Sequence, residues 1–148
     1  MTYIDTLNWI HSHKANGRRP SLERMCHLLN LLDNPQNKFP AVHVVGTNGK
    51  GSTTSFLQHI LTASGYKTGT FTSPFITRFN ERIAIDSKEI SDSDLVKTAQ
   101  AIKPIVDSND FQEKVGKVTE FELVTTLMFY YFATINPVDV AVIEAGIG

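Results

Sequence analysis

The sequence is poor in cysteine and in long apolar runs, and each shortage excludes a class of protein. Its 148 residues hold one cysteine, Cys26, so no internal disulfide can support the fold. Cys26 lies among Met25, Leu28 and Leu29, which predicts a buried and inert thiol. No apolar run approaches the roughly 18 residues of a membrane helix, and the N-terminus lacks a secretory signal pattern. We therefore expect a cytoplasmic protein with no membrane partner.

The net charge is also close to zero. The chain has 14 lysines and arginines against 15 acidic residues, a formal charge of −1. Such a balance creates no long-range field for steering nucleic acid, so no nucleic-acid partner is expected. The composition, 41% hydrophobic and 20% charged, is ordinary for a globular protein, and one domain of this length can bury a core without a metal or disulfide.

Hydrophobic spacing in the first half of the chain predicts two helices and then a strand–loop–helix–strand unit. Ile4, Leu7 and Ile10 recur at helical spacing before Gly17. A second helix opens at Pro20-Ser21, with one apolar face made by Leu22, Met25, Cys26, Leu29 and Leu32. Residues 41–45 form a β-branched run typical of a strand buried on both faces. After a glycine loop, a helix carries Phe56, Leu57, Ile60 and Leu61, Gly65 ends it in a left-handed conformation, and residues 68–72 form the next strand.

The second half continues the alternation. Ile83 and Ile85 indicate a short strand or hairpin, and residues 91–94 start a helix whose stripe is Leu95, Ala99, Ile102 and Val106. Pro104 predicts a kink or early end there, and residues 107–117 are patternless and read as a loop. Residues 119–122 form a capping box before a mostly apolar helix that Asn136-Pro137 stops. Residues 138–143 then form a buried strand, so the predicted fold is α/β, a mostly parallel sheet flanked by helices.

The strongest chemical signal is the loop Gly46-Thr47-Asn48-Gly49-Lys50-Gly51-Ser52. A strand ends, glycines let the backbone curl, and a helix begins where free N–H groups can hold phosphate oxygens. Lys50 adds a mobile positive charge for the β- and γ-phosphates, and Ser52 or Thr53 offers a hydroxyl to phosphate or Mg²⁺. The strict nucleotide-loop pattern is not met, because only two residues separate Gly46 from Gly49 and Gly51 follows Lys50. Spacing alone predicts a general phosphate loop; the alternative is a glycine turn that only joins strand to helix.

Glu144 is the second signal, since it follows the apolar strand Val140-Ala141-Val142-Ile143. This position predicts a carboxylate on the same sheet edge as the phosphate loop, where ligands of open α/β sheets bind. A carboxylate there can take one Mg²⁺ position directly or through water. The alternative is a strand-end acid that faces solvent.

The third signal is the segment from Thr72 to Arg82, Thr72-Ser73-Pro74-Phe75-Ile76-Thr77-Arg78-Phe79-Asn80-Glu81-Arg82. Ser73 closes the second strand at the same edge, and Pro74 forces a turn. Two arginines, an asparagine and two aromatic residues share one loop, a mixture that suits a planar, anionic ligand. The alternative is a solvated loop with a Glu81–Arg82 ion pair.

Together these segments resemble one family. The loop at 46–52 resembles the compact phosphate loop of folylpolyglutamate synthase and dihydrofolate synthase, the folate branch of the Mur ligase superfamily. Thr72-Ser73-Pro74 with 78–83 resembles the family's folate-side loop, Ser21-Leu22-Glu23-Arg24-Met25 its N-terminal substrate segment, and Glu144-Ala145-Gly146-Ile147-Gly148 the run after its metal-site strand. Ala145 stands where the family pattern has Val.

The resemblance implies an ATP-dependent amide ligase. ATP would phosphorylate a folate carboxylate, and the amino group of L-glutamate would displace phosphate from the acyl phosphate. Lys50 and Mg²⁺ would neutralise the transferring phosphoryl group, with Ser73 and Glu144 as the metal-site residues. The folate side would use residues of the 73–82 loop, namely Ser73, Pro74, Phe75, Arg78, Asn80, Glu81 and Arg82. The substrates implied are a reduced folate or dihydropteroate, and the parent enzyme is expected to be a monomer.

The family also uses a metal-binding histidine, a carbamylated lysine and a C-terminal domain that this sequence does not contain. We therefore expect residues 1–148 to be the N-terminal portion of the ATP-binding, Mur ligase central domain, unable to complete ligation alone. Two other readings stay open. One is a small P-loop kinase or GTPase, although no Asn-Lys-x-Asp run or arginine-rich lid is evident. The other is a non-catalytic ATP-binding module with a vestigial loop.

Overall fold

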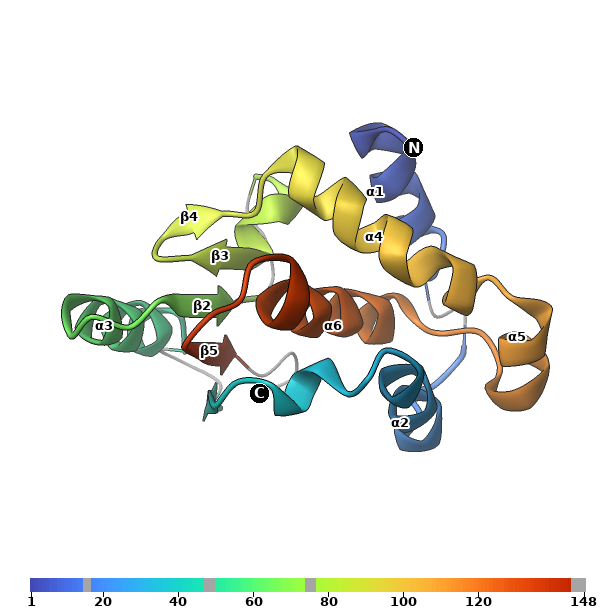
Figure 1. Cartoon of the computed structure of the whole chain (residues 1–148), viewed down its shortest axis with the longest axis horizontal. Helices are drawn as coiled ribbons and strands as arrows, with labels where there is room; N and C mark the ends of the chain where they lie inside the picture. Colours follow the sequence, from blue (N-terminus) through green and yellow to red (C-terminus); the bar gives the residue numbers. More distant parts are fainter. Residues whose placement is uncertain (15–16, 47–49, 74–76, 145–148) are drawn as a thin grey trace. The chain divides into compact units, whose positions relative to one another are not determined.

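The computed structural model describes residues 1–14, 17–46, 50–73 and 77–144, and the chain divides into two compact units. A helical unit is made of Met1–Gln36 and Asp92–Ile135, and a sheet unit of Asn37–Ser91 and Asn136–Gly148. Each unit therefore combines two segments that are distant in the sequence, as the colours in Figure 1 show. None of the described helices is long and apolar enough to cross a bilayer.

The helical unit contains five α-helices among its described residues: α1 (Tyr3–His11), α2 (Leu22–Leu31), α4 (Asp92–Val106), α5 (Asn109–Val115) and α6 (Glu120–Tyr130), which a π-helical turn (Tyr131–Ile135) extends. Helix α6 contacts both α1 and α4, and its Leu123, Val124, Leu127 and Met128 are fully buried, as the sequence predicts. Phe121 at its start is the exception, with 45% exposure. The stripe predicted for α4 is confirmed too: Leu95, Ala99, Ile102 and Val106 are at most 1% exposed.

Helix starts in this unit follow side-chain caps. The predicted box at α6 is confirmed, because the Thr119 hydroxyl accepts from the Glu122 N–H and the Glu122 carboxylate accepts from the Thr119 N–H. Ser21 caps α2 as predicted, by accepting from the Arg24 N–H. Thr2 caps α1 in the same way, with Asp5 reaching back, and the backbone N–H of Thr2 holds the pKa of the Asp5 carboxyl below its usual range.

Several sequence expectations about this unit are wrong. The segment 107–117 is not a loop throughout, because Ser108 accepts from the Phe111 N–H and starts α5. Helix α4 continues two residues past Pro104, so the early end does not occur. Cys26 is exposed and Leu22 is 81% exposed, because α2 buries Arg24 and Leu28; of the expected apolar face, Leu29 is buried.

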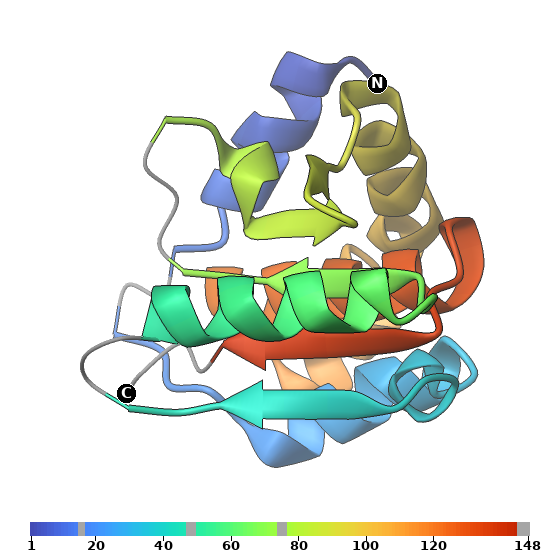
Figure 2. The same ribbon diagram turned by 90° about the vertical axis from the view of Figure 1, so that its left-hand side faces the viewer.

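The described residues of the sheet unit form five strands in the order β1-β5-β2-β3-β4: β1 (Ala41–Val44), β2 (Thr68–Phe71), β3 (Ile83–Ile85), β4 (Lys88–Glu89) and β5 (Val140–Glu144). Strands β1, β5 and β2 are parallel, and β3 and β4 add an antiparallel hairpin, so the sheet is mixed. Helix α3 (Lys50–Ala63) packs against β5, β2 and β1 and covers one face of this parallel part (Figure 2).

Strand β1 differs from its prediction. It is the outer strand of the described sheet, with β5 as its neighbour, and three of its four residues are exposed. The central place of the parallel part β1-β5-β2 belongs to β5, whose Ala141 and Val142 are fully buried. Two further predictions for this unit are confirmed: Gly65 ends α3 with φ +96°, and residues 83–89 form a hairpin that turns at Asp86 and Ser87, both with positive φ.

Candidate functional site

The parallel strands bring three of the predicted segments to one edge of the sheet. Val44 at the end of β1 lies beside Glu144, and Phe71 at the end of β2 lies beside Ile143. Gly46 follows β1 and Ser73 follows β2, so both leave the sheet where β5 delivers Glu144. Figure 2 shows the arrowheads of β1, β5 and β2 pointing to this same side. This is the edge at which open parallel sheets bind ligands.

The phosphate-loop prediction falls partly on described residues. Gly46 has φ +137°, a backbone conformation that side-chain-bearing residues rarely adopt, so the chain turns here as the sequence predicts. Thr47, Asn48 and Gly49 lie outside the described residues, as does the side chain of Lys50. Helix α3 begins at Lys50, and Gly51, Ser52 and Thr53 are exposed in its first turn. The first turn of a helix presents N–H groups without intrahelical partners, which suits an anionic ligand.

Glu144 is buried rather than solvent-facing, with 5% exposure. Its Oε2 accepts a hydrogen bond from the Thr54 hydroxyl of α3 at 3.4 Å, and Thr54 is itself 3% exposed. Sequence reasoning did not identify Thr54. The available signal was its position, one helical turn after Lys50 and hence on the same side of α3.

A polar cavity of about 170 Å³ opens beside this pair. Hydroxyl, amide and imidazole groups surround it, from Thr54, Ser55, Gln58, His59, Thr70, Thr72 and Ser87, together with Gly51. Much of this lining is already hydrogen-bonded: the Ser87 hydroxyl donates to Gln58 Oε1, and Gln58 Nε2 donates to the Thr62 hydroxyl. The cavity therefore has fixed walls and lies next to the first turn of α3.

Ser73 is held by Arg82. The guanidinium donates from Nη2 to the Ser73 hydroxyl at 3.4 Å and from Nε to the Thr72 carbonyl at 3.3 Å. It also lies over the rings of Phe71 and Phe79, at 5.4 and 6.0 Å from their centroids. These contacts join the start of β3 to the end of β2. In this arrangement Arg82 fixes the Ser73 hydroxyl near the sheet edge.

The other predicted folate-side residues have different surroundings. Pro74 and Phe75 lie outside the described residues. Arg78 is exposed and pairs with Glu89 at 3.6 Å, and the Glu81 carboxylate accepts from the backbone N–H groups of Thr77 and Arg78. Asn80 is fully buried and donates from Nδ2 to the Ile90 carbonyl at 2.8 Å. The contact roles expected for these residues stay predictions, and the described bonds shape the turn that leads into β3.

The helical unit has a second cavity, of about 230 Å³, beside the start of α2. Its lining is mostly apolar and comes from Pro20, Ser21, Leu22, Met25, Phe121, Glu122 and Thr125. Leu22 and Phe121 are 81% and 45% exposed, so this cavity presents two large apolar side chains to solvent. This cavity includes part of the predicted substrate segment 21–25. Phe121 and Thr125 are additions that the sequence reading missed, because it treated 119–122 only as a helix cap.

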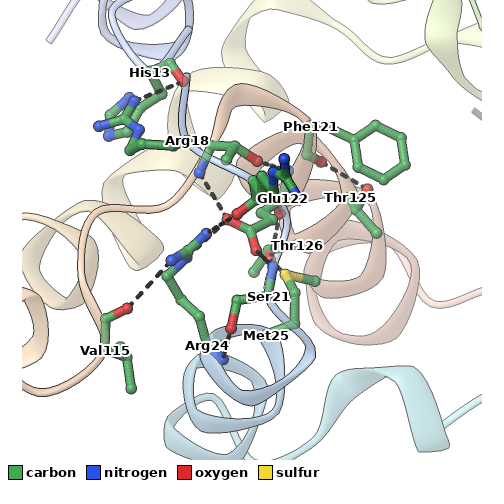
Figure 3. A network of polar contacts seen from close by, with 12 residues as sticks. His13, Arg18, Ser21, Arg24, Met25, Val115, Phe121, Glu122, Thr125 and Thr126 are labelled. Atoms are coloured by element: carbon green, nitrogen blue, oxygen red, sulfur yellow. Dashed lines mark hydrogen bonds and ion pairs between the residues drawn. The ribbon is translucent and has the colours of Figure 1, made fainter. Parts of the chain in front are cut away.

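A buried ion pair fixes one wall of this cavity (Figure 3). Glu122 Oε1 accepts from Arg24 Nε at 2.9 Å, and Oε2 accepts from the Ser21 N–H at 2.8 Å. Arg24 also donates to the Val115 and Arg19 carbonyls. The network ties the starts of α2 and α6 to the end of α5, which holds the Ser21 and Glu122 side of the cavity in place.

Two relatives among known sequences match almost the whole chain. It is 44% identical over 146 residues to the dihydrofolate synthase/folylpolyglutamate synthase of Bacillus subtilis, and 44% identical over 148 residues to the folylpolyglutamate synthase (FPGS) of Lacticaseibacillus casei. These alignments cover 99% and 100% of this chain and 34% of each relative. No protein-family model matches.

Solved structures agree. The chain superposes on a complex of FPGS with AMPPCP and folate with a TM-score of 0.91 and 44% identity, covering 100% of this chain and 36% of that one. It therefore spans about a third of the length of the relatives it matches.

Proposed function

Because the chain is homologous over its whole length to the N-terminal part of the folylpolyglutamate and dihydrofolate synthases, we propose that it forms the phosphate- and folate-binding part of an ATP-dependent ligase. The ligase would join L-glutamate to a folate carboxylate. The observation that carries the proposal is the meeting of Gly46, Ser73 and Glu144 at one sheet edge, beside the first turn of α3.

The reaction proposed has two steps. A folate carboxylate oxygen attacks the γ-phosphorus of ATP, and ADP leaves to give an acyl phosphate. The amino group of L-glutamate then attacks the acyl carbon, inorganic phosphate leaves, and the amine loses a proton as the amide forms. Both steps concentrate negative charge on phosphate oxygens, so positioning and charge neutralisation supply most of the catalysis.

Residues of this chain have separate tasks in that scheme. The N–H groups at the start of α3 and the hydroxyls of Ser52 and Thr53 hold phosphate oxygens, with Thr47, Asn48, Gly49 and Gly51 as the rest of the loop. Lys50 is the catalytic residue proposed, as the positive charge on the β- and γ-phosphates.

The oxygen ligands at this edge suit Mg²⁺, which proteins usually bind through one or two carboxylates plus substrate phosphates. Glu144 supplies a buried carboxylate and Ser73 a hydroxyl held by Arg82. The described residues contain no group of three or more His, Cys, Asp or Glu side chains that could hold a metal by themselves. An ion held jointly by protein and nucleotide would supply charge neutralisation when bound.

The cavity of the helical unit is proposed for the flat ring of the folate or dihydropteroate substrate. Support comes from its apolar lining, its exposed Phe121, and the polar edge that Ser21, Glu122 and Thr125 provide. A planar heterocycle needs that combination of an apolar face and few fixed polar groups. The resemblance to the family separately assigns a folate-side role to residues of the 73–82 loop in the sheet unit. A cytoplasmic location and a monomeric full-length enzyme, both expected from the sequence, remain proposals.

Calorimetric titration tests both parts. Mg-ATP and a reduced folate are titrated separately into the wild-type chain and into Lys50→Ala, with Lys97→Ala as the matched control because Lys97 is exposed on α4. We expect Lys50→Ala to weaken Mg-ATP binding at least tenfold and to leave folate binding unchanged. Equal Mg-ATP affinity in wild type and Lys50→Ala would support a non-catalytic module instead.

The folate cavity is tested in the same way. Phe121→Ala should weaken folate binding at least tenfold, whereas Phe56→Ala, which removes a 69% exposed phenylalanine from α3, should not. A tenfold loss corresponds to about 1.4 kcal/mol, the scale of one aromatic stacking contact plus its buried area. Unchanged folate affinity in Phe121→Ala would refute the assignment of this cavity.

A further inference from the structure

Thr54 is a buried hydroxyl in a stretch of exposed ones. Its neighbours Ser52, Thr53 and Ser55 are exposed, whereas Thr54 is 3% exposed. A helical threonine hydroxyl commonly bonds the backbone carbonyl of the preceding turn. Among the contacts of the described residues, the Thr54 hydroxyl donates across to Glu144 Oε2 on β5. The bond therefore joins the helix that follows the phosphate loop to the strand that carries the carboxylate.

The bond between Thr54 and Glu144 contributes more to the orientation of the carboxylate than to the stability of the fold. At 3.4 Å it is longer than the usual 2.5–3.0 Å of hydroxyl hydrogen bonds, so its own contribution to stability is small. Its site is buried, however, and a β-branched side chain has few χ1 choices. Among the described residues, one hydroxyl engages one oxygen of this carboxylate, and a cation can take the second oxygen.

The orientation of the Glu144 carboxylate matters because its partner Thr54 lines a cavity at the start of α3. Thr54, Gly51 and Thr72 line the same polar cavity of about 170 Å³ beside the first turn of α3. Groups that orient a ligating carboxylate commonly change metal affinity by 10–100-fold when they are removed. A free carboxylate at a strand end would sample several χ2 and χ3 values, and each new cation would have to order it again.

We propose that Thr54 is a positioning residue that orients the Glu144 carboxylate for Mg²⁺ bound with the nucleotide. This inference rests on the proposed function, in which Glu144 is a metal ligand. Thr54 touches neither nucleotide nor metal in this proposal and acts only through Glu144.

The test measures Mg²⁺ affinity directly. The Kd of Mg²⁺ is obtained by calorimetry at saturating ATP, and ATP affinity is measured separately without Mg²⁺. The variants are Thr54→Val, which keeps shape and removes the hydroxyl, and Thr54→Ser, which keeps the hydroxyl. Thr70→Val is the matched control, because Thr70 lines the same cavity from β2. Glu144→Gln reports on the metal assignment itself.

We expect Thr54→Val to raise the Mg²⁺ Kd about tenfold with ATP affinity in the absence of Mg²⁺ unchanged. Thr54→Ser and Thr70→Val should stay within about twofold of wild type. If Thr54→Val does not fold, as judged by its far-UV circular dichroism, Thr54→Ala is compared with Thr54→Ser in the same assay.

The outcomes separate the two proposals. If Glu144→Gln leaves the Mg²⁺ Kd unchanged, or wild type does not bind Mg-ATP, the proposed function fails and Thr54 loses its role with it. If Glu144→Gln weakens Mg²⁺ while Thr54→Val stays within twofold, the positioning role alone is overturned. The same holds if Thr54→Ser is as weak as Thr54→Val, because packing and not the hydroxyl would then matter.

Discussion

Replacing Glu122 by glutamine should destabilise the chain strongly, although the two side chains have nearly the same shape. The Glu122 side chain is 2% exposed, and its partner Arg24 is 10% exposed (Figure 3). Oε1 accepts from the Thr119 N–H and Arg24 Nε, and Oε2 accepts from the Ser21 N–H. Glutamine has a single acceptor oxygen, so one of these two sets of donors must face an NH₂ group.

The expected cost combines two effects. If the glutamine oxygen takes the Oε1 position, the Ser21 N–H is left without its acceptor, which costs roughly 1–3 kcal/mol. The Arg24 charge also loses its counter-ion in a nearly buried position, and breaking buried ion pairs typically costs about 3–5 kcal/mol in all. We therefore expect Glu122→Gln to lower the free energy of unfolding by about 3–4 kcal/mol.

Urea unfolding followed by far-UV circular dichroism measures this change. Glu120→Gln is the matched control on the same helix, since Glu120 pairs with His11 where the two side chains are 26% and 39% exposed, and its loss should cost under about 1 kcal/mol. The double variant Arg24→Met with Glu122→Leu should be more stable than Glu122→Gln, because it removes both charges. A cost below 1 kcal/mol for Glu122→Gln, or a double variant less stable than it, would refute this reasoning.

Three further predictions concern the sheet unit, and urea unfolding checks each of them. Gly65→Ala should lower the free energy of unfolding by about 1 kcal/mol, because φ is +96° although a Cβ meets no atom within 4 Å. Gly51 is equally open but lies inside α3, so Gly51→Ala should raise the free energy of unfolding by roughly 0.5–1 kcal/mol. The reverse order of the two variants would contradict the backbone argument. Asn80→Leu should cost about 1–3 kcal/mol, because a buried carbonyl loses its amide donor, and a neutral result would show that the bond is dispensable. Arg82→Met should lower the free energy of unfolding by about 1–2 kcal/mol, because two hydrogen bonds and two ring contacts are lost. Arg78→Met removes an exposed ion pair and should cost under about 1 kcal/mol. Equal costs for the two variants would argue against the anchoring role of Arg82.

Local signals in the sequence predicted much of the helical unit correctly. The capping box at Thr119 and the stripe of α4 depend on residues three or four apart, and such signals are complete within one helical turn. The errors arose where burial depends on distant partners. Helix α2 buries Arg24 because Glu122, 98 residues away, neutralises it, and the apolar Leu22 is left exposed beside a cavity. No pattern within α2 contains that information.

The candidate site likewise combines residues that the sequence predicts with residues that only the structure identifies. The glycine loop, the strand-end acid and the strand-end serine could be recognised from the sequence, because the carboxyl ends of parallel strands lie at the same edge of a sheet. The roles of Thr54 and Arg82 were not, since each depends on which element lies across from it. Arg82 was predicted as a folate contact, yet its described contacts hold Thr72 and Ser73. Asn80 likewise bonds the backbone of the following hairpin.

The sequence by itself determined the α/β class and placed an acid at the end of the last strand, and it predicts a phosphate loop at 46–52, because turns, caps and apolar runs are encoded by neighbouring residues. Only the tertiary structure decided that β5 enters between β1 and β2, which leaves β1 as the outer strand of the described sheet. That insertion brings a residue from near position 144 beside one from near position 44. Pairing between segments a hundred residues apart depends on the packing of the whole sheet, and it places Glu144 within reach of the Thr54 hydroxyl.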